Sequence, residues 1–277
     1  MEIINFLIWP FIACILLILT HAYFGIHILE RGIIFVDLSL AQFVGVGIAL
    51  SFLFGYEGTE RYIFSVAFAV LGAFILAFSR RIARYTNIEA FIGVLYIFSL
   101  AASILILDRS PHGLEEFKSI LNGNIIWVES QSVLYTFILY LVISIPHVIF
   151  RKRFLALSRD GEGGFVWEFI FFLSFAIMLV NSVQMAGILQ VFAFLIIPAL
   201  IGRLFTRKPI KVLITGWLLG LVSSTFGIVA SYKWDMPVAP VIVASLSVLF
   251  FFVLLIIGVF RKRNGHDLKT LSGCQNE

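Results

Sequence analysis

The residue of this 277-residue chain with the clearest chemical potential is an aspartate inside an apolar stretch. Asp37 is followed at intervals of four residues by Ala41, Gly45 and Ala49. In a helix this spacing puts one carboxylate and three small residues on one face, which favours close helix packing. Because an isolated carboxylate is costly to bury, Asp37 is a candidate cation ligand. The structural alternative is that Asp37 pairs with Arg31.

Two histidines and a glutamine accompany Asp37 in the same part of the chain. His21 and His27 are six residues apart and fall on roughly opposite helix faces, so they lack the i, i+4 spacing of a helical metal site. His21 is a candidate transient metal ligand, and an interhelical hydrogen bond is the equal alternative. Gln42 lies about 140° round the helix from Asp37, so the two share a site only if the backbone is distorted.

An acidic cluster with one histidine lies in the polar segment 108–131. His112, Glu115 and Glu116 have the spacing H-x-x-E-E. Imidazole and carboxylate suit divalent first-row metals, but an exposed acidic surface is the commoner meaning of such a cluster. We therefore expect these residues to dock a partner. The partly apolar segment around them is expected to form a short helix or a re-entrant piece at the interface.

The elements that must position these residues are apolar helices. Hydrophobic residues make up 61% of the chain and charged residues 13%, against roughly 45–50% and about 25% in soluble domains. Each crossing of a bilayer core of about 30 Å needs roughly 20 apolar residues. The composition excludes a soluble globule, a disordered chain and a coiled coil. It predicts an all-α, polytopic integral membrane bundle with eight or nine transmembrane helices.

Nine apolar stretches support this count, and the division between the sixth and the seventh is the least certain. They fall at about 6–28, 33–54, 63–79, 88–107, 132–150, 167–182, 186–205, 212–231 and 238–260. We expect residues 1–263 to form a single transmembrane domain and residues 264–277 a short polar cytoplasmic tail.

The basic residues divide unequally between the two sides of a nine-helix arrangement. Sixteen of the 20 Lys and Arg residues lie on the side that holds the C-terminus. The positive-inside rule places that side in the cytoplasm, and the N-terminus outside. The formal charge of +4 and the pI of about 9.1 therefore reflect orientation in the membrane, and no nucleic acid is expected as a partner.

Uncharged polar residues gather at the expected break between 167–182 and 186–205. Asn181, Gln184 and Gln190 supply amide groups there, and Pro198 is expected to interrupt the seventh helix. Irregular backbone is tolerated at membrane depth where it lines a cavity. We therefore expect Gln184, Gln190 and Pro198, together with Gln42, to line a translocation path.

Signals of catalysis are weak in this sequence. It contains no G-x-x-x-x-G-K-[ST] phosphate loop, no H-E-x-x-H and no G-x-S-x-G. A membrane enzyme built on His21, His112 and Asp37 requires these residues to converge, whereas the topology puts His112 outside and Asp37 near the cytoplasm. A transporter or channel component that binds no cofactor is favoured. One form of it is a self-sufficient secondary transporter or channel with Asp37 as an ion or proton relay.

Four segments, in order along the chain, resemble the permease subunits of the zinc, manganese and iron ABC transporters. They are RGIIFVDLSLAQ at 31–42, the outer stretch from PHGLEE to NGNIIWV at 111–128, VQMAGILQVFAFLIIPA at 183–199 and SYKWDMPVAP at 231–240. The resemblance spans about residues 11–260. It implies the permease subunit of an importer in the cytoplasmic (inner) membrane of a bacterium, with a divalent metal as the transported substrate.

The resemblance also implies partners. These are cytoplasmic ATP-binding subunits, an extracytoplasmic metal-binding protein, and a second permease chain in what we expect to be a homodimer surrounded by membrane lipid. Asp37 matches the family's second-helix aspartate, and Ala41 stands where the family often has histidine. The cytoplasmic segment 153–164 is shorter than the family's coupling segment. We expect it to contact the ATPase through Ser158, Asp160 and Glu162, with help from the loop 206–211.

Overall fold

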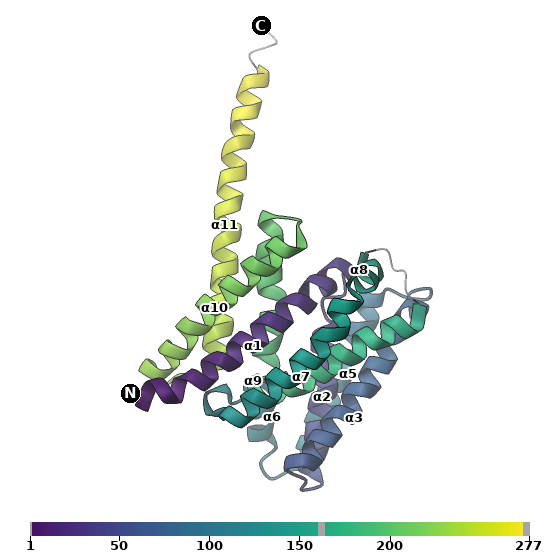
Figure 1. Cartoon of the computed structure of the whole chain (residues 1–277). Helices are drawn as coiled ribbons and strands as arrows, with labels where there is room; N and C mark the ends of the chain where they lie inside the picture. Colours follow the sequence, from purple (N-terminus) through teal and green to yellow (C-terminus); the bar gives the residue numbers. More distant parts are fainter. Residues whose placement is uncertain (1, 160–163, 274–277) are drawn as a thin grey trace.

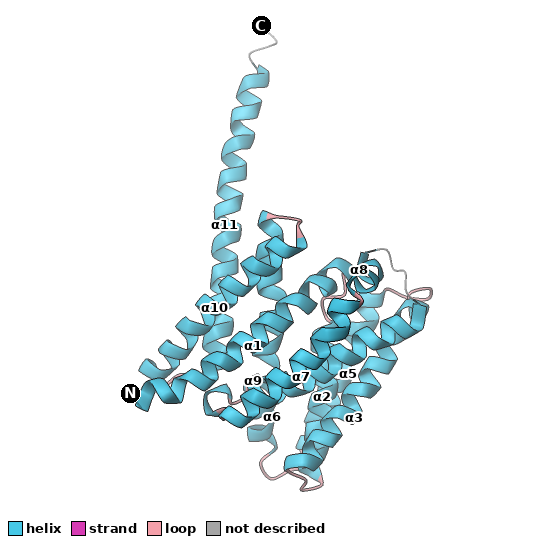
Figure 2. Ribbon diagram, in the orientation of Figure 1, coloured by secondary structure: helices cyan, strands magenta, loops and turns pink. Residues whose placement is uncertain are grey.

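A computed structural model gives the arrangement of residues 2–159 and 164–273. This described part is helical and contains no strand (Figures 1 and 2). The elements are α1 (Glu2–Arg31), α2 (Val36–Leu53), α3 (Gly58–Ala77), α4 (Ser79–Ile82), α5 (Ile88–Leu107), α6 (Gly113–Asn122), η1 (Ile125–Trp127), α7 (Ser130–Ile149), α8 (Arg151–Arg159), α9 (Gly164–Phe205), α10 (Pro209–Trp234) and α11 (Val238–Gly273). The backbone of the predicted polar tail is thus helical as far as Gly273.

Eight of these helices are long and apolar enough to cross a membrane. One of them, α9, has 42 residues, which corresponds to about 63 Å of helix, roughly twice the thickness of a bilayer core. Its backbone leaves the helical conformation at Gly187, where φ is 76° and ψ is 165°. A single unbroken crossing therefore does not describe α9.

The chain reverses direction within α9, because both ends of this helix lie against the same end of α1. Near its start, Glu168 accepts a hydrogen bond from Arg31 at 2.8 Å. Near its end, Arg203 contacts Glu30 at 2.6 Å. The two halves on either side of Gly187 are therefore antiparallel and cross the membrane separately. The described helices make nine crossings, within the predicted range of eight or nine.

The reversal packs against the outer segment formed by α6 and η1. A Cβ atom on Gly187 would lie 2.3 Å from the backbone nitrogen of Gly123, so two backbones touch at this point. The amide of Asn124 donates to the carbonyl of Met185 at 3.3 Å. Ile125 is buried here. The outer segment is thus a short helix and a 3-10 turn held against the bundle, as the sequence predicted.

The predicted interruption at Pro198 is wrong. In α9, which is described along its whole length, only Gly187 is non-helical, and the helix continues through Pro198. The ring packs on α10, where a Cβ atom on Gly216 would lie 3.3 Å from the Cβ of Pro198. Because Gly216 has no side chain, α10 accommodates the ring, and only the hydrogen bond lost at proline remains as a cost.

At the centre of the bundle, α2 is enclosed on all sides, with 14 of its 18 residues buried. The closest approach to a neighbour is at Gly47, where a Cβ atom would lie 2.6 Å from the carbonyl oxygen of Phe64 in α3. Gly45, on the Asp37 face, leaves an ordinary 3.5 Å to Ile120 of α6. The small residues of α2 therefore permit close packing. The tightest contact is at Gly47, which lies outside the helix face that carries Asp37 and Gly45.

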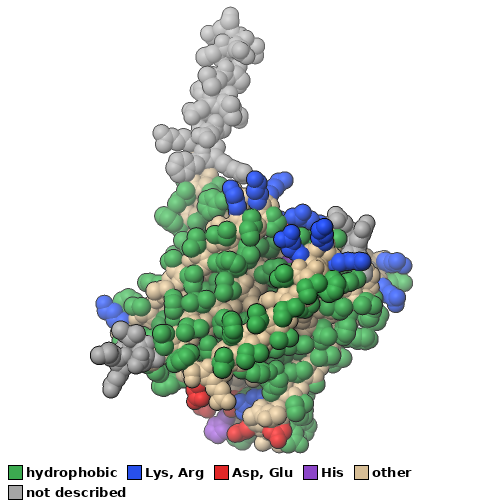
Figure 3. Space-filling model, in the orientation of Figure 1, with side chains coloured by type: hydrophobic (Ala, Val, Ile, Leu, Met, Phe, Trp, Pro, Cys, Tyr) green, Lys and Arg blue, Asp and Glu red, His purple; other side chains and the backbone are tan. Residues whose placement is uncertain are grey.

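The charged side chains divide between two opposite edges of the molecule. In the face shown in Figure 3, Lys and Arg gather along the upper edge, where α10 begins and α7 passes into α8, and acidic residues gather along the lower edge. A broad apolar band separates them. This distribution agrees with the predicted orientation, in which the basic edge faces the cytoplasm.

Candidate translocation and coupling sites

Asp37 is enclosed in the first turn of α2. Its side chain is fully buried, and neither carboxylate oxygen has a hydrogen-bond partner. The predicted alternative, a pair between Asp37 and Arg31, is wrong, because Arg31 instead contacts Glu168 and lies over the ring of Phe171 at 4.2 Å. Since a buried carboxylate without a partner is costly, Asp37 offers two oxygen ligands to a cation.

His21 also has an unused ligand atom. Its Nδ1 is hydrogen-bonded to the carbonyl oxygen of Leu17 at 2.7 Å, while its buried Nε2 has no partner. With the proton on Nδ1, the lone pair on Nε2 is available. No contact joins His21 to Asp37, and among the described residues no three His, Cys, Asp or Glu side chains form a possible metal cluster. Among the described residues, Asp37 and His21 are thus separate possible metal ligands and do not form a complete metal-binding site.

The four predicted path residues do not share one surface. Gln42 and Gln190 are buried, and Pro198 is buried against α10. The amide of Gln190 donates to the sulfur of Cys14 at 3.5 Å, and its Oε1 has no partner. Gln184 is exposed on the other half of α9. Within a single chain these side chains therefore line no common channel.

The predicted coupling residue Ser158 points into the protein. It is 5% exposed, its hydroxyl is hydrogen-bonded to Nδ1 of His27 at 2.8 Å, and the Nε of Arg31 donates to it at 3.4 Å. Ser158 therefore fastens α8 to α1, and its side chain is not on a docking surface. Asp160 and Glu162 lie outside the described residues. The exposed residue at this end of α8 is Arg159.

Around Ser158 the structure shows a polar network that the sequence reasoning missed. Tyr23, His27 and Arg31 are spaced by four along α1 and so share one face. The Tyr23 hydroxyl is hydrogen-bonded to Nδ1 of His147 at 3.1 Å, and Nε2 of the same ring is hydrogen-bonded to Ser174 at 2.8 Å. The i, i+4, i+8 spacing of Tyr23, His27 and Arg31 is the sequence pattern from which this network could have been predicted.

The outer acidic cluster lies at the start of α6. Nδ1 of His112 is 3.4 Å from a carboxylate oxygen of Glu115, and these side chains are 75% and 81% exposed. Glu116 is partly exposed. The pair is open to solvent on the side opposite the basic edge, so the predicted docking role stays a prediction that the geometry permits.

A bundle with nine crossings, a basic cytoplasmic edge and an unpaired carboxylate in its centre is the architecture of a multi-pass membrane permease. The model of the ABC 3 transport family matches residues 3–257, and the chain belongs to this family. It is therefore a permease component of a metal transport system of the bacterial inner membrane, and not an enzyme.

Known relatives are similar over most of their length. The manganese transport system membrane protein MntC of Listeria monocytogenes is 25% identical over 238 residues, which cover 83% of each chain. The chelated iron transport system membrane protein YfeC of Yersinia pestis is 24% identical over 236 residues, covering 83% of this chain and 79% of YfeC. The solved structure of PsaBC from Streptococcus pneumoniae in complex with Fab has the same fold, with a TM-score of 0.73, 22% identity and 90% of each chain covered.

Proposed function

We propose that this chain is the permease subunit of an importer for a divalent transition metal, with manganese as its main substrate. Cytoplasmic ATP-binding subunits drive it and an extracytoplasmic metal-binding protein supplies it. Two copies of the chain enclose the path. The observation that carries the proposal is Asp37, whose buried carboxylate has two oxygens without partners. An ionisable group at membrane depth is, by default, a sign of an ion pathway.

The donor atoms on α2 favour manganese, and the imidazole of His21 lies on α1 with no contact to Asp37. The ligand group on α2 is a carboxylate, and Ala41, one turn further along, adds no donor atom. Carboxylate, carbonyl and water oxygens suit Mn²⁺, whereas imidazole suits Zn²⁺ and iron. The relatives MntC and YfeC are named for manganese and for chelated iron transport, respectively. Among the described residues of one chain, the possible metal ligands form no cluster of three or more. Such isolated ligands are expected to bind a metal ion only briefly as it passes.

The two edges of the molecule fit the two kinds of partner. The exposed acidic start of α6, with His112 and Glu115, faces outward and offers a docking surface to the extracytoplasmic protein. The basic edge offers α8 and the loop before α10 to the ATP-binding subunits. Glu30 contacts both Arg159 at 3.8 Å and Arg203 at 2.6 Å, so both cytoplasmic segments are connected through α1.

The test is uptake of radioactive Mn²⁺ into proteoliposomes that contain the chain, its ATP-binding subunit and its binding protein. We expect Asp37→Asn to reduce uptake by at least about tenfold while the assembled complex stays intact in size-exclusion chromatography. The matched control is Glu57→Gln, an acid-to-amide change at an exposed outer position, which should leave uptake unchanged. Normal uptake by Asp37→Asn would remove this residue from the path.

A self-sufficient transporter that uses Asp37 as a proton or ion relay is the second candidate. The same partnerless carboxylate supports it, because such a group can also carry a proton. The chain alone, reconstituted without ATP-binding subunits, distinguishes the two functions. Metal movement driven by an ion gradient in that preparation would contradict the importer.

A further inference from the structure

A groove lies over α1 on the membrane-facing side of the bundle, between α7 and α10. These three helices run side by side in Figure 1, with α1 in the middle. The groove has a volume of about 440 Å³. Tyr23 of α1 forms part of its floor, Ser144 of α7 and Trp217 of α10 form its walls, and Arg151 lies at one end. Because the walls belong to membrane-spanning helices, the groove opens toward lipid.

The polar atoms of Tyr23 on the floor and of Trp217 on the wall are already paired inside the protein. The Tyr23 hydroxyl is hydrogen-bonded to His147, and the indole nitrogen of Trp217 donates to the carbonyl oxygen of Leu19 at 3.3 Å. What these side chains present to the groove is therefore their apolar ring surface. An apolar occupant satisfies such a surface, whereas a polar one would lose its hydrogen bonds to water.

The end of the groove is positively charged. Arg151 is exposed and forms no ion pair with a described residue. The loop before α10 carries Arg207 and Lys208, which are exposed but do not line the groove. The start of α8 and the loop before α10, which hold these residues, are part of the basic edge described above. A basic pocket between transmembrane helices on the cytoplasmic side is a pattern that binds anionic lipid headgroups.

The length of the groove matches one leaflet of the membrane. Its lining on α7 and α8 runs from Tyr140 to Arg151, a separation of about 16 Å along the chain. The hydrocarbon of one leaflet is about 15 Å thick, half of the bilayer core. An acyl chain whose headgroup is at Arg151 therefore fits within the groove.

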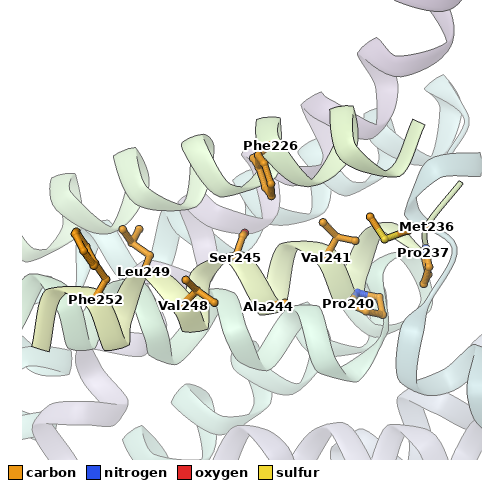
Figure 4. Close-up of a pocket in the computed structure, with 10 residues that line it drawn as sticks. All are labelled: Phe226, Met236, Pro237, Pro240, Val241, Ala244, Ser245, Val248, Leu249 and Phe252. Atoms are coloured by element: carbon orange, nitrogen blue, oxygen red, sulfur yellow. The ribbon is translucent and has the colours of Figure 1, made fainter. Parts of the chain in front are cut away.

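We propose that this groove binds one anionic phospholipid of the cytoplasmic leaflet. Its phosphate pairs with Arg151, and an acyl chain lies along Tyr23 and Trp217. A second copy of the protein is a less suitable occupant of the groove. In the same membrane orientation it would place its own basic edge beside Arg151 and would not neutralise that charge. The groove between α10 and α11, with a volume of about 780 Å³, differs because none of its described lining residues is charged (Figure 4). Nothing there selects a headgroup.

The experiment uses Trp217 as the reporter. The other four tryptophans, Trp9, Trp127, Trp167 and Trp234, are replaced by phenylalanine in the full-length chain. The protein is reconstituted in phosphatidylcholine vesicles that contain increasing fractions of brominated phosphatidylglycerol or brominated phosphatidylcholine. We expect half-maximal quenching at about fivefold lower fraction of the anionic lipid, the effect of one basic group near the surface.

Substitutions distinguish binding of the lipid headgroup from binding of its acyl chain. Arg151→Gln should remove the preference and Arg151→Lys should retain it, while Arg84→Gln, at an exposed position in another cytoplasmic loop, should leave it unchanged. Ser144→Phe should fill the groove and reduce quenching by both lipids, unlike Leu141→Phe at a 52% exposed position of α7 outside the lining. Equal quenching by the two lipids in the unsubstituted reporter would overturn the proposal. Absence of quenching would also overturn it, because another chain would then cover the groove.

Discussion

The side chains of Arg31 and Glu168 are only 6% and 3% exposed, although both belong to helices that cross the membrane. Each charge compensates the other, and the guanidinium also lies over Phe171. Such a pair contributes little compared with apolar residues of the same shape, but it becomes costly when one partner is removed. Its main effect is to specify where α9 starts relative to the end of α1.

Removal of one partner should be strongly destabilising. We expect Glu168→Ala to lower the free energy of unfolding by about 3–5 kcal/mol, because the buried Arg31 loses the carboxylate that lies 2.8 Å from it. Arg159→Ala is the control, since Arg159 is 48% exposed and lies 3.8 Å from Glu30, and it should cost at most about 1 kcal/mol. Thermal unfolding midpoints in detergent measure both. Equal shifts would show that the Arg31–Glu168 pair is no more important than a surface contact.

The donor atoms near Asp37 should determine metal preference. Ala41→His places an imidazole one helical turn from the carboxylate, and we expect Zn²⁺ to become a stronger competitor of Mn²⁺ uptake, by about tenfold or more. Ala41→Gln, which adds bulk without an imidazole, should give no such change. The measurement is inhibition of Mn²⁺ uptake by added Zn²⁺. An unchanged Zn²⁺ inhibition constant in the histidine variant would place position 41 away from the path.

At the scale of elements, a single glycine separates the two halves of α9. Gly187 has φ of 76° and ψ of 165°, a backbone region that is essentially limited to glycine and costs other residues on the order of 1–3 kcal/mol, and it touches the backbone of Gly123. Two helices are thus joined without an intervening loop. The outer segment occupies the position where such a loop would lie.

Gly187→Ala should therefore disrupt the fold. The methyl group needs both an unfavourable φ and the space taken by Gly123, so we expect a loss of well over about 2 kcal/mol or failure to accumulate in the membrane. Gly93→Ala, in α5 with no atom within 4 Å of the added carbon, should be neutral or stabilising by about 0.5–1 kcal/mol. Fluorescence-detected size-exclusion chromatography after heating compares them. A stable Gly187→Ala protein would show that the turn can open.

At the scale of the whole molecule, the nine crossings fix which loops face which side. A single crossing by α9 would move the loop before α10 to the outside, whereas the reversal at Gly187 keeps it in the cytoplasm. In a background where Cys14 and Cys274 are replaced by serine, we expect Arg207→Cys to react with a membrane-impermeant maleimide only after permeabilisation. Lys118→Cys, in α6, should react in intact cells. Labelling of Arg207→Cys in intact cells would contradict the reversal.

Hydropathy was sufficient to predict the helices and their number within one, because these depend on composition over whole segments. The orientation inferred from the charges stays a prediction. Contacts between distant residues were not predictable in the same way. The break in α9 is at Gly187 because Gly123 packs there, and Pro198 remains helical because Gly216 makes room for its ring. Ser158 was expected on a surface, but the face of α8 that it occupies depends on His27.

The turn at Gly187 has a mechanical consequence. It is pressed against the outer segment, while the two ends of the same helix are fastened to the cytoplasmic end of α1 through Glu168 and Arg203. No flexible loop separates the two halves of α9 at this contact. A displacement of α6 from outside is therefore transmitted directly to α9. It acts on both halves of α9, whose far ends lie at the basic edge of the molecule, beside the end of α1 and α8.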